Sequence, residues 1–294
     1  GTMTAITTGV KTHMGAIGVS AGPRNDCADS LNKHLLTWLQ LADSAGMATG
    51  VVSTARLTHA TPAATYAHAP DRNWENDTNL PEAAKAAGCA DIAQQLLSTA
   101  RYGRGPLVVL GGGRAQFTTV EERDPEYDDK VGQRLDGRSL VAEWQQAHPQ
   151  GAYVWNAEQF KAAANAPALL GLFEPDHMQY ELDRARDKAG EPSLAELTRA
   201  AIANRSRHGE GYVLMVEGAR IDHANHSGNA YRALSDTVAL SDAVRAAVEA
   251  TSDQDTLIIV TADHSHTLNF VGYPARGNPI LGKVKDKGGE DGAG

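Results

Sequence analysis

Two patterns of apolar and polar positions alternate along this chain. Short runs of consecutive apolar residues, rich in Val, Leu and Ile, are typical of strands that are buried on both faces. Between these runs, apolar residues recur every three or four positions, as in amphipathic helices. This alternation predicts an α/β fold with three layers, in which a central, mostly parallel sheet is flanked by helices. The expected strands cover residues 49–53, 106–110, 152–155, 168–173, 211–216 and 255–260.

Side chains that can cap helices mark several boundaries. Asp29 or Ser30 can cap a helix over residues 31–46, where the apolar positions have helical spacing. Ser193 and Glu196 have the spacing of a capping box and predict another helix start. Further helices are expected at residues 91–100, at 140–146 and from about 229 to 250.

The length and charge of the chain limit the number of domains and exclude some classes of protein. The 294 residues are enough for one large α/β domain or two smaller ones. A formal net charge of −9 argues against a general nucleic-acid-binding protein. No run approaches the roughly 20 apolar residues that span a bilayer. No secretory signal is visible, but the chain begins at Gly1 and not at Met, which leaves a processed or missing N-terminus open.

Two cysteines, Cys27 and Cys89, have two interpretations. They are either two buried thiols of a cytosolic protein or a disulfide that closes a loop of roughly 60 residues. A disulfide would place the protein outside the reducing cytosol. The spacing of the two residues does not decide between these interpretations.

Carboxylates and imidazoles cluster directly after the last two expected strands. Glu217, Asp222 and His226 follow the first of these strands, and Asp263 and His264 follow the second. In a parallel sheet, ligands and catalytic groups collect at the carboxyl ends of the strands. Carboxylate oxygens and neutral imidazole nitrogens are the ligands that zinc accepts at an open, catalytic site. The sequence therefore predicts a metal-dependent enzyme.

These residues also have a simpler explanation. A lone Asp-His pair is more often a surface group or a helix cap. Asp222 and His226, however, are four positions apart and would face the same way on one helical turn. Two clusters at two strand ends favour a shared metal site over unrelated surface groups.

A third polar segment follows the first expected strand. His59 and Thr61 can face the same cleft, although Thr61 before a proline is also a common helix start. Arg72 lies in the polar loop beyond, where a guanidinium suits a bidentate anion such as phosphate, although most loop arginines are solvated. Residues 111–113 are three glycines that match neither the Walker nor the Rossmann spacing, and they predict a tight turn.

Together these segments resemble alkaline phosphatase. Four motifs carry the resemblance, which covers nearly the whole chain, and they occur in that family's order and at its approximate spacing. They are Thr58-His59-Ala-Thr61-Pro-Ala, Asp71-Arg72-Asn-Trp, Glu217-Gly-Ala-Arg-Ile-Asp222-His223-Ala-Asn-His226 and Thr261-Ala-Asp263-His264-Ser-His266.

The resemblance implies two zinc ions. Asp222 and His226 would bind the first zinc, and Asp263 and His264 would bind the second. His266 would lie near the first zinc as a residue that orients the ligands. The zinc ligands expected from the family thus lie in the two motifs that follow the last two strands.

The resemblance also implies a magnesium ion and a phosphate pocket. Thr61 and Glu217 would bind the magnesium, and Arg72 would hold the substrate phosphate. His59 and His223 stand where some bacterial members have aspartate and lysine. This histidine pair resembles the animal-type enzymes and would adjust the charge around the magnesium and the phosphate.

The animal-type branch further implies a calcium site and a disulfide. Glu126, Phe173 through its carbonyl, Glu174 and Glu191 would hold the calcium, since three carboxylates and a carbonyl suit a hard cation. A short insertion precedes Glu191. The two cysteines fall where that branch has a disulfide, which favours the bridge over free thiols. A periplasmic or secreted homodimer that acts on phosphate monoesters is the implied whole protein, with no nucleic-acid partner and no membrane anchor visible.

The nucleophile expected from the family is not in the chain. It lies in Asp-Ser-Ala-Gly-Thr, and this chain opens at the Gly-Thr, so the serine would precede Gly1 by two residues. An upstream aspartate and a downstream histidine that complete the metal sites are also missing. We therefore interpret residues 1–294 as a single alkaline phosphatase-like domain truncated at both ends, and expect this piece alone to be inactive. Ser44 repeats the motif at residues 43–46, but it closes an expected helix, whereas the family's nucleophile lies at a helix N-terminus.

Two other functions remain open. A sulfatase or phosphodiesterase on a similar scaffold would share the Asp-His metal ligands and would favour sulfate esters or diesters. A degenerate member would bind metal or phosphate without turnover, and only the missing nucleophile supports it.

Overall fold

Five parallel strands form the centre of the molecule. The computed structural model describes residues 1–22, 25–98, 104–207, 209–269 and 275–281. The strand order is β3-β4-β2-β1-β5, and every neighbouring pair is parallel. The predicted α/β class, with a central parallel sheet flanked by helices, is confirmed. The strands are β1 (Ala48–Arg56), β2 (Val108–Gly112), β3 (Ala152–Val154), β4 (Leu169–Leu172) and β5 (Tyr212–Glu217).

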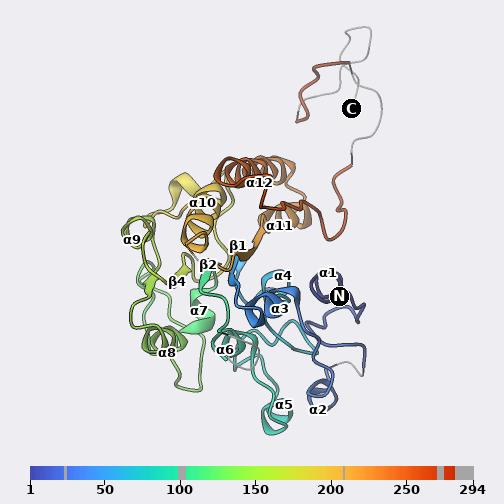
Figure 1. Cartoon of the computed structure of the whole chain (residues 1–294), viewed down its shortest axis with the longest axis vertical. Coiled ribbons are helices and arrows are strands. Elements are labelled where there is room, and N and C mark those ends of the chain that lie inside the picture. Colours follow the sequence, from blue (N-terminus) through green and yellow to red (C-terminus); the bar gives the residue numbers. More distant parts are fainter. Residues whose placement is uncertain (23–24, 99–103, 208, 270–274, 282–294) are drawn as a thin grey trace.

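Both faces of the sheet are buried, which explains the continuous apolar runs. Neighbouring residues of a strand point to opposite faces, and Val51 and Val52 of β1 enter two different hydrophobic cores. Two groups of helices cover these cores from opposite sides of the sheet (Figure 1). The Val51 side has α3 (Trp38–Ser44), α6 (Ile92–Leu97) and α8 (Leu140–Ala147), and the Val52 side has α9 (Ala157–Ala162), α10 (Leu194–Arg205) and α12 (Ala230–Ala250).

Short helices complete the chain, and three of them directly follow the carboxyl ends of strands. These three are α4 after β1, α7 after β2 and α11 after β5. In the described part of the chain, no helix is long and apolar enough to cross a membrane. The short helices are α1 (Thr2–Thr8), α2 (Cys27–Ser30), α4 (Ala60–Ala63), α5 (Glu82–Ala86), α7 (Arg114–Phe117), η2 (Arg184–Arg186) and α11 (Arg220–His226).

Capping side chains decide where two helices begin. The predicted capping box of Ser193 and Glu196 is present at the start of α10. The predicted helix over residues 31–46 is wrong in its first half, because Thr37 and Gln40 form a second capping box that starts α3 at position 38. The residues expected as caps, Asp29 and Ser30, belong instead to the separate short helix α2.

The predicted strand over residues 255–260 is also wrong. These residues have no strand pairing, and Leu257 and Ile259 are 83% and 76% exposed. The segment leaves the end of α12 and runs past α11, outside the sheet (Figure 1). An apolar run indicates only that burial of the segment is favourable. A strand also needs a hydrogen-bonded neighbouring strand, which can be far away in sequence. Among the described residues, nothing pairs with the outer side of β5.

The tight turn predicted at residues 111–113 is narrower than expected, because Gly111 and Gly112 belong to β2 and only Gly113 lies between β2 and α7. Gly113 has φ 95°, in the left-handed region that glycine adopts without strain, and it precedes α7. Its amide donates to the carbonyls of Glu174 and Asp176, at 3.0 and 2.6 Å. A Cβ atom at Gly112 would overlap the backbone of Asp176. The glycines therefore allow the segment after β4 to lie directly against the end of β2.

The expected disulfide between Cys27 and Cys89 is present. It joins the start of α2 to the segment after α5, with 6.0 Å between the two Cα atoms. Both cysteines pack in a small hydrophobic cluster with Trp74, Leu80 and Ala84. The bridge thus ties the long polar loop after α4 back to the N-terminal part of the chain.

Replacing both cysteines by serine is expected to lower the free energy of unfolding by about 4 kcal/mol, the chain-entropy value for a loop of this length. The two residues are 62 apart in sequence. Chemical denaturation of the oxidised wild type and of the double variant measures the difference. Equal stability of the two proteins would mean that the bridge contributes nothing to the folded state.

Candidate metal and phosphate site

The charged side chains of the site follow the carboxyl ends of four strands, which lie at one edge of the sheet. β1 leads to α4, β2 to α7, β4 to the segment with Glu174 and His177, and β5 to α11. Because all the strands are parallel, these segments meet although they are far apart in sequence. The register pairs Ser53 of β1 with Glu217 of β5, so these two side chains are neighbours at the edge.

Asp222, His226 and His266 form the first of three side-chain clusters. Asp222 and His226 lie one turn apart on α11, and His226 Nε2 is 3.5 Å from Asp222 Oδ2. His266 Nε2 is closer, at 3.1 Å from Asp222 Oδ1. One ligand atom of each residue lies within 4.8 Å of the other two. A carboxylate and two imidazoles in this arrangement suit a zinc ion.

Asp263 and His264 lie next to this first cluster. His264 Nε2 is 3.4 Å from Asp263 Oδ2 and 3.7 Å from Asp222 Oδ1, so Asp222 faces both candidate zinc sites. Their segment is not a strand, but Thr267 Oγ1 donates to the carbonyl of Asn225 at 3.2 Å and holds the segment against α11. The four residues expected to bind zinc are therefore close together.

Glu217 lies at the end of β5 between two hydroxyl groups. Ser53 Oγ donates to Glu217 Oε2 at 2.5 Å, and the Thr61 hydroxyl also interacts with this carboxylate. Burial raises the pKa of Glu217 to about 7, against the opposite effect of the two hydroxyls. A carboxylate with hydroxyl neighbours offers oxygen ligands only, as magnesium requires. The expected pair of Thr61 and Glu217 is brought together.

Glu126, Glu174 and Asp187 form a second cluster, which contains only carboxylates. Glu126 Oε1 and both oxygens of Asp187 are buried and have no hydrogen-bond partner among the described residues. Burial raises the pKa of Glu126 to about 7, and it also raises the pKa of Glu174 and of Asp187. Unpaired buried oxygens that face one another fit a hard cation such as calcium, which would hold them ionised.

The other two residues expected at the calcium site border this cluster. Glu191 has one unpaired buried oxygen, and burial and the nearby Glu174 raise its pKa to about 9. Phe173 is buried beside Glu174 in sequence, and its ring packs edge-to-face on Phe160. Arg114 donates to Asp124 and Glu126, so the arginine after the glycine turn serves this acidic cluster and not a phosphate.

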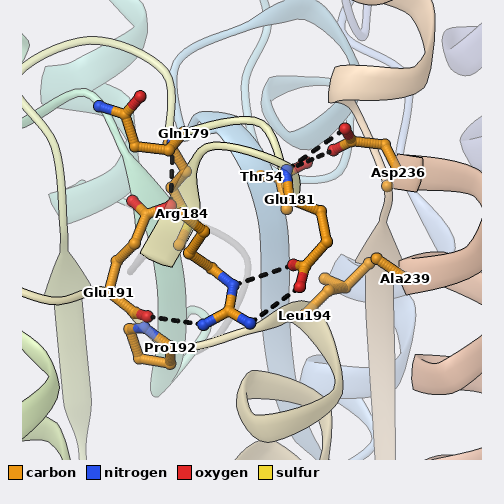
Figure 2. Close-up of a pocket in the computed structure, with 11 residues that line it drawn as sticks. Thr54, Gln179, Glu181, Arg184, Glu191, Pro192, Leu194, Asp236 and Ala239 are labelled. Atoms are coloured by element: carbon orange, nitrogen blue, oxygen red, sulfur yellow. Dashed lines mark hydrogen bonds and ion pairs between the residues drawn. The ribbon is translucent and has the colours of Figure 1, made fainter. Parts of the chain in front are cut away.

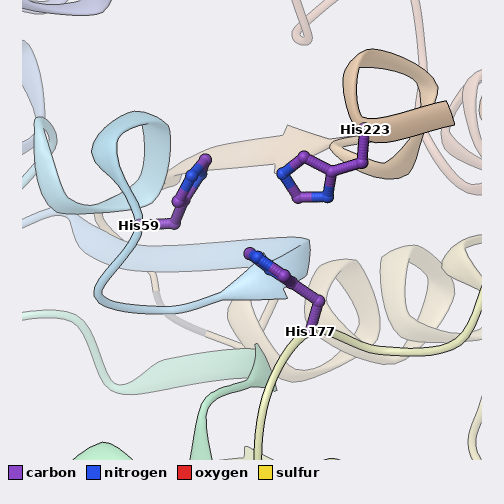
Figure 3. Close-up of side chains that lie close together, drawn as sticks. All are labelled: His59, His177 and His223. Atoms are coloured by element: carbon purple, nitrogen blue, oxygen red, sulfur yellow. The ribbon is translucent and has the colours of Figure 1, made fainter. Parts of the chain in front are cut away.

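His59, His177 and His223 form the third cluster (Figure 3). The ring centroids of His177 and His223 are 4.2 Å apart, and that of His59 is 5.2 and 5.3 Å from them. Burial, aided by nearby guanidinium groups, lowers the pKa of His59 to about 3 and of His223 to about 4. The pKa of His177 is lowered still further, for the same reasons. All three rings are therefore neutral.

Arg72 connects the third cluster to the N-terminus of the chain. Its Nη2 is 2.9 Å from His59 Nε2, and it forms no ion pair with a carboxylate in the described part of the chain. The charges of Arg72 and Asp263 both act electrostatically at Gly1. Gly1 thus lies close to both Arg72 and Asp263, at the same edge of the sheet.

A cavity beside these clusters has acidic walls (Figure 2). Arg184 is neutralised by Glu181, whose carboxylate accepts two hydrogen bonds from it. Glu191 and Asp236 also line the cavity, and burial raises the pKa of Asp236 to about 6. The cavity therefore offers no free cationic group for a phosphate.

Two residues of the site, His177 and Asp187, were not predicted from the sequence. His177 belongs to a third Asp-His pair, Asp176-His177, which follows the apolar strand β4 just as Asp222-His223 follows β5. That repeated pattern would have identified it. Asp187 lies in the insertion before Glu191, and no signal in the sequence distinguishes it from the other charged residues there. Ser44, in contrast, ends α3 before the start of β1, away from this edge, as expected.

The fold and the clusters define the class of protein: an α/β protein with candidate metal ligands at the carboxyl edge of a parallel sheet. The alkaline phosphatase family profile matches residues 1–293. The chain belongs to the alkaline phosphatase family.

Individual relatives agree with this assignment. The tissue-nonspecific alkaline phosphatase isozyme of Gallus gallus is 43% identical over 291 residues, which cover 96% of this chain and 55% of that protein. The Homo sapiens isozyme is 42% identical over the same lengths. The chain therefore spans about half the length of the curated relatives it matches.

Solved structures show the same fold. The alkaline phosphatase of Thermus thermophilus has a TM-score of 0.65 and 33% identity, and the match covers 86% of this chain and 44% of that one. The alkaline phosphatase of the Antarctic bacterium TAB5 has a TM-score of 0.69 and 24% identity, with 99% of this chain and 69% of that chain covered. At this low identity, the second match supports the fold alone.

Glu217→Gln is expected to make the metal-free protein less sensitive to pH. The folded-state pKa of Glu217 is raised from 4.5 to about 7, so its ionisation destabilises the metal-free fold as pH rises through this window. The variant should therefore gain stability relative to wild type between these pH values, by up to about 3 kcal/mol. Denaturation at several pH values measures the gain, with Glu158→Gln on the exposed side of α9 as control. A difference that does not change with pH would contradict the expectation.

Proposed function

We propose that the protein containing this chain hydrolyses phosphate monoesters with the help of bound divalent metals. The main support is the position of Arg72, a guanidinium without a carboxylate partner among the described residues, close to Gly1 and Asp263. It lies at the edge where the metal-ligand candidates gather. A donor-only, planar cation beside metals is suited to hold the oxygens of a phosphoryl group.

The proposed metal assignments follow the clusters. Asp222 and His226 hold one zinc and Asp263 and His264 a second, with His266 beside the first. Support comes from the contacts of 3.1 to 3.7 Å that join these side chains. Glu217 and Thr61 hold magnesium, and the cluster of Glu126, Glu174 and Asp187, with Glu191 and the Phe173 carbonyl at its border, holds calcium.

The proposed reaction passes through a phosphoserine. When bound, zinc and magnesium supply positive charge that lowers the pKa of the attacking hydroxyl and stabilises the leaving oxygen. Arg72 donates to the equatorial oxygens of the phosphoryl group, where charge accumulates in the transition state. The proximity of Gly1 to Arg72 and Asp263 supports a nucleophilic serine two positions before Gly1.

We further propose that the protein is secreted or periplasmic and acts as a homodimer. The disulfide between Cys27 and Cys89 supports an oxidising compartment. The dimer is implied by the family, and light scattering of the complete protein measures it. Residues 1–294 form one domain in this proposal.

The complete protein is expected to hydrolyse an aryl phosphate at alkaline pH, to lose this activity on chelation and to recover it with zinc and magnesium. The metals would supply positive charge at the attacking and leaving oxygens, in addition to the charge of Arg72. Release of the phenol from 4-nitrophenyl phosphate measures the activity. Faster turnover of sulfate esters or diesters would favour a sulfatase or phosphodiesterase, and a zinc-loaded protein without turnover would favour a binding protein.

Arg72→Ala is expected to weaken inhibition by inorganic phosphate about 10- to 150-fold, the range for loss of a charged hydrogen bond. Zinc content should stay unchanged, because Arg72 contacts none of the proposed zinc ligands. Inhibition constants and metal analysis measure the two effects. Arg186→Ala, an arginine with an 86% exposed side chain on η2, is the control. Undiminished inhibition in Arg72→Ala would remove Arg72 from the proposal.

A further inference from the structure

Ser53 is the last residue of β1 that pairs with β5, and its partner in the register is Glu217. The serine is 0% exposed, and its Oγ lies 2.5 Å from Glu217 Oε2. The two residues are 164 positions apart in sequence, so strand pairing brings a hydroxyl group from the first third of the chain to a proposed metal ligand. None of the metal assignments above gives Ser53 a role.

The hydroxyl of Ser53 is held in one orientation. Its oxygen accepts a hydrogen bond from the backbone amide of Ala55 at 2.9 Å. A serine hydroxyl has one proton, and an ionised carboxylate can only accept a hydrogen bond. When Glu217 is ionised, as a metal ligand must be, Ser53 therefore donates its single proton to Oε2 of Glu217.

The strands on both sides of Ser53 fix its position. On one side, Ser53 is paired with Glu217 of β5. On the other side, Gly111 of β2 lies so close that a Cβ atom there would be 2.8 Å from the carbonyl oxygen of Ser53. The hydroxyl therefore belongs to a rigid part of the sheet, although the register between β1 and β2 is irregular between Val52 and Arg56.

Glu217 has hydroxyl neighbours but no cationic partner. In the described part of the chain, no lysine or arginine forms an ion pair with Glu217, and the nearby charges that act on it are the carboxylates of Asp263 and Asp222. Hydroxyl groups can orient a carboxylate, but they do not balance its charge. A bound cation would balance it.

The two hydroxyls beside Glu217 come from different kinds of element. Thr61 lies on the short helix α4, and the proposed function makes it a ligand of magnesium. Ser53 lies inside the central sheet, where its proton is donated to Glu217 and its oxygen accepts from Ala55. Ser53 is therefore suited to hold the carboxylate, whereas Thr61 is suited to contact the cation.

We propose that Ser53 is a positioning residue of the magnesium site, which sets the orientation of the Glu217 carboxylate towards the cation. This inference rests on the proposed function, which places magnesium at Glu217 and Thr61. Hydrogen-bond partners of metal ligands fix the orientation of the ligand, and their loss weakens metal binding roughly 10- to 100-fold. Ser53 is such a partner, at a position that strand pairing fixes.

Magnesium titration of the complete, zinc-loaded protein by isothermal calorimetry tests this role without turnover. Ser53→Ala is expected to raise the dissociation constant of magnesium about 10- to 100-fold. Ser53→Thr, which keeps the hydroxyl, is expected to bind magnesium as the wild type does. Equal affinity of Ser53→Ala and wild type, or a loss in Ser53→Thr as large as in Ser53→Ala, would overturn the positioning role.

Thr49→Val is the matched control for the loss of a buried hydroxyl from β1. Thr49 is 1% exposed, and its hydroxyl has no hydrogen-bond partner among the described residues. The affinity for magnesium should therefore stay unchanged in this variant. A loss as large as that in Ser53→Ala would mean that any change in the core of β1 disturbs the site, which would overturn the specific role of Ser53.

A purely structural role of Ser53 predicts a different result. Ser53→Ala also removes the acceptor of the Ala55 amide, which lowers stability without acting on the metal. A ligand that binds only the folded state raises the unfolding temperature, and the rise depends on its affinity. At a fixed magnesium concentration, the rise is expected to be smaller in Ser53→Ala than in wild type. An equal rise from a lower starting temperature would contradict the positioning role.

The wild-type protein separates this inference from the proposed function. If the wild type binds no magnesium, the magnesium assignment fails, and the role of Ser53 fails with it. If the wild type binds magnesium and hydrolyses phosphate monoesters while Ser53→Ala binds magnesium equally well, the proposed function stands and only the inference about Ser53 is wrong.

Discussion

The parallel pairing of β1 with β2 and β5 is the constraint on which the site depends. Because the three strands run in the same direction within one sheet, their carboxyl ends must meet at one edge. The register that places Ser53 beside Glu217 is fixed by the pairing of six successive residues of β1 and β5. Strand pairing alone therefore brings side chains from the first and last thirds of the chain together.

Charge is divided along this edge into separate regions. Carboxylates with unpaired buried oxygens surround Asp187 on one side, and on the other side the guanidinium groups of Arg72 and Arg220 face the rings of His59 and His223. Burying a charged group alone is unfavourable, since a buried charge needs a partner. The proposed calcium ion would be such a partner for the carboxylates around Asp187.

Most of the fold and much of the site could be predicted from local sequence patterns. Apolar runs identified β1, β2 and β4, because strands buried on both faces need no alternation, and they also identified the half-buried strand β5. The same criterion failed at residues 255–260. Whether a segment pairs with a distant strand cannot be recognised from the sequence of that segment alone. Asp222 and His226 could be paired from helical spacing, whereas Asp187 joins its cluster only through the folding of a loop. His177 could have been predicted, because the pair Asp176-His177 follows an apolar run.

The contact between Gly112 and the backbone of Asp176 has a consequence for the geometry of the third cluster. The segment from Glu174 to Met178 rests on the end of β2, and His177 lies on it. A side chain at position 112 would displace this segment and, with it, the imidazole of His177 in the third cluster. The absence of a side chain at Gly112 thus sets the position of His177 relative to His59 and His223. A small residue at a strand end can in this way fix the geometry of a site that it does not touch.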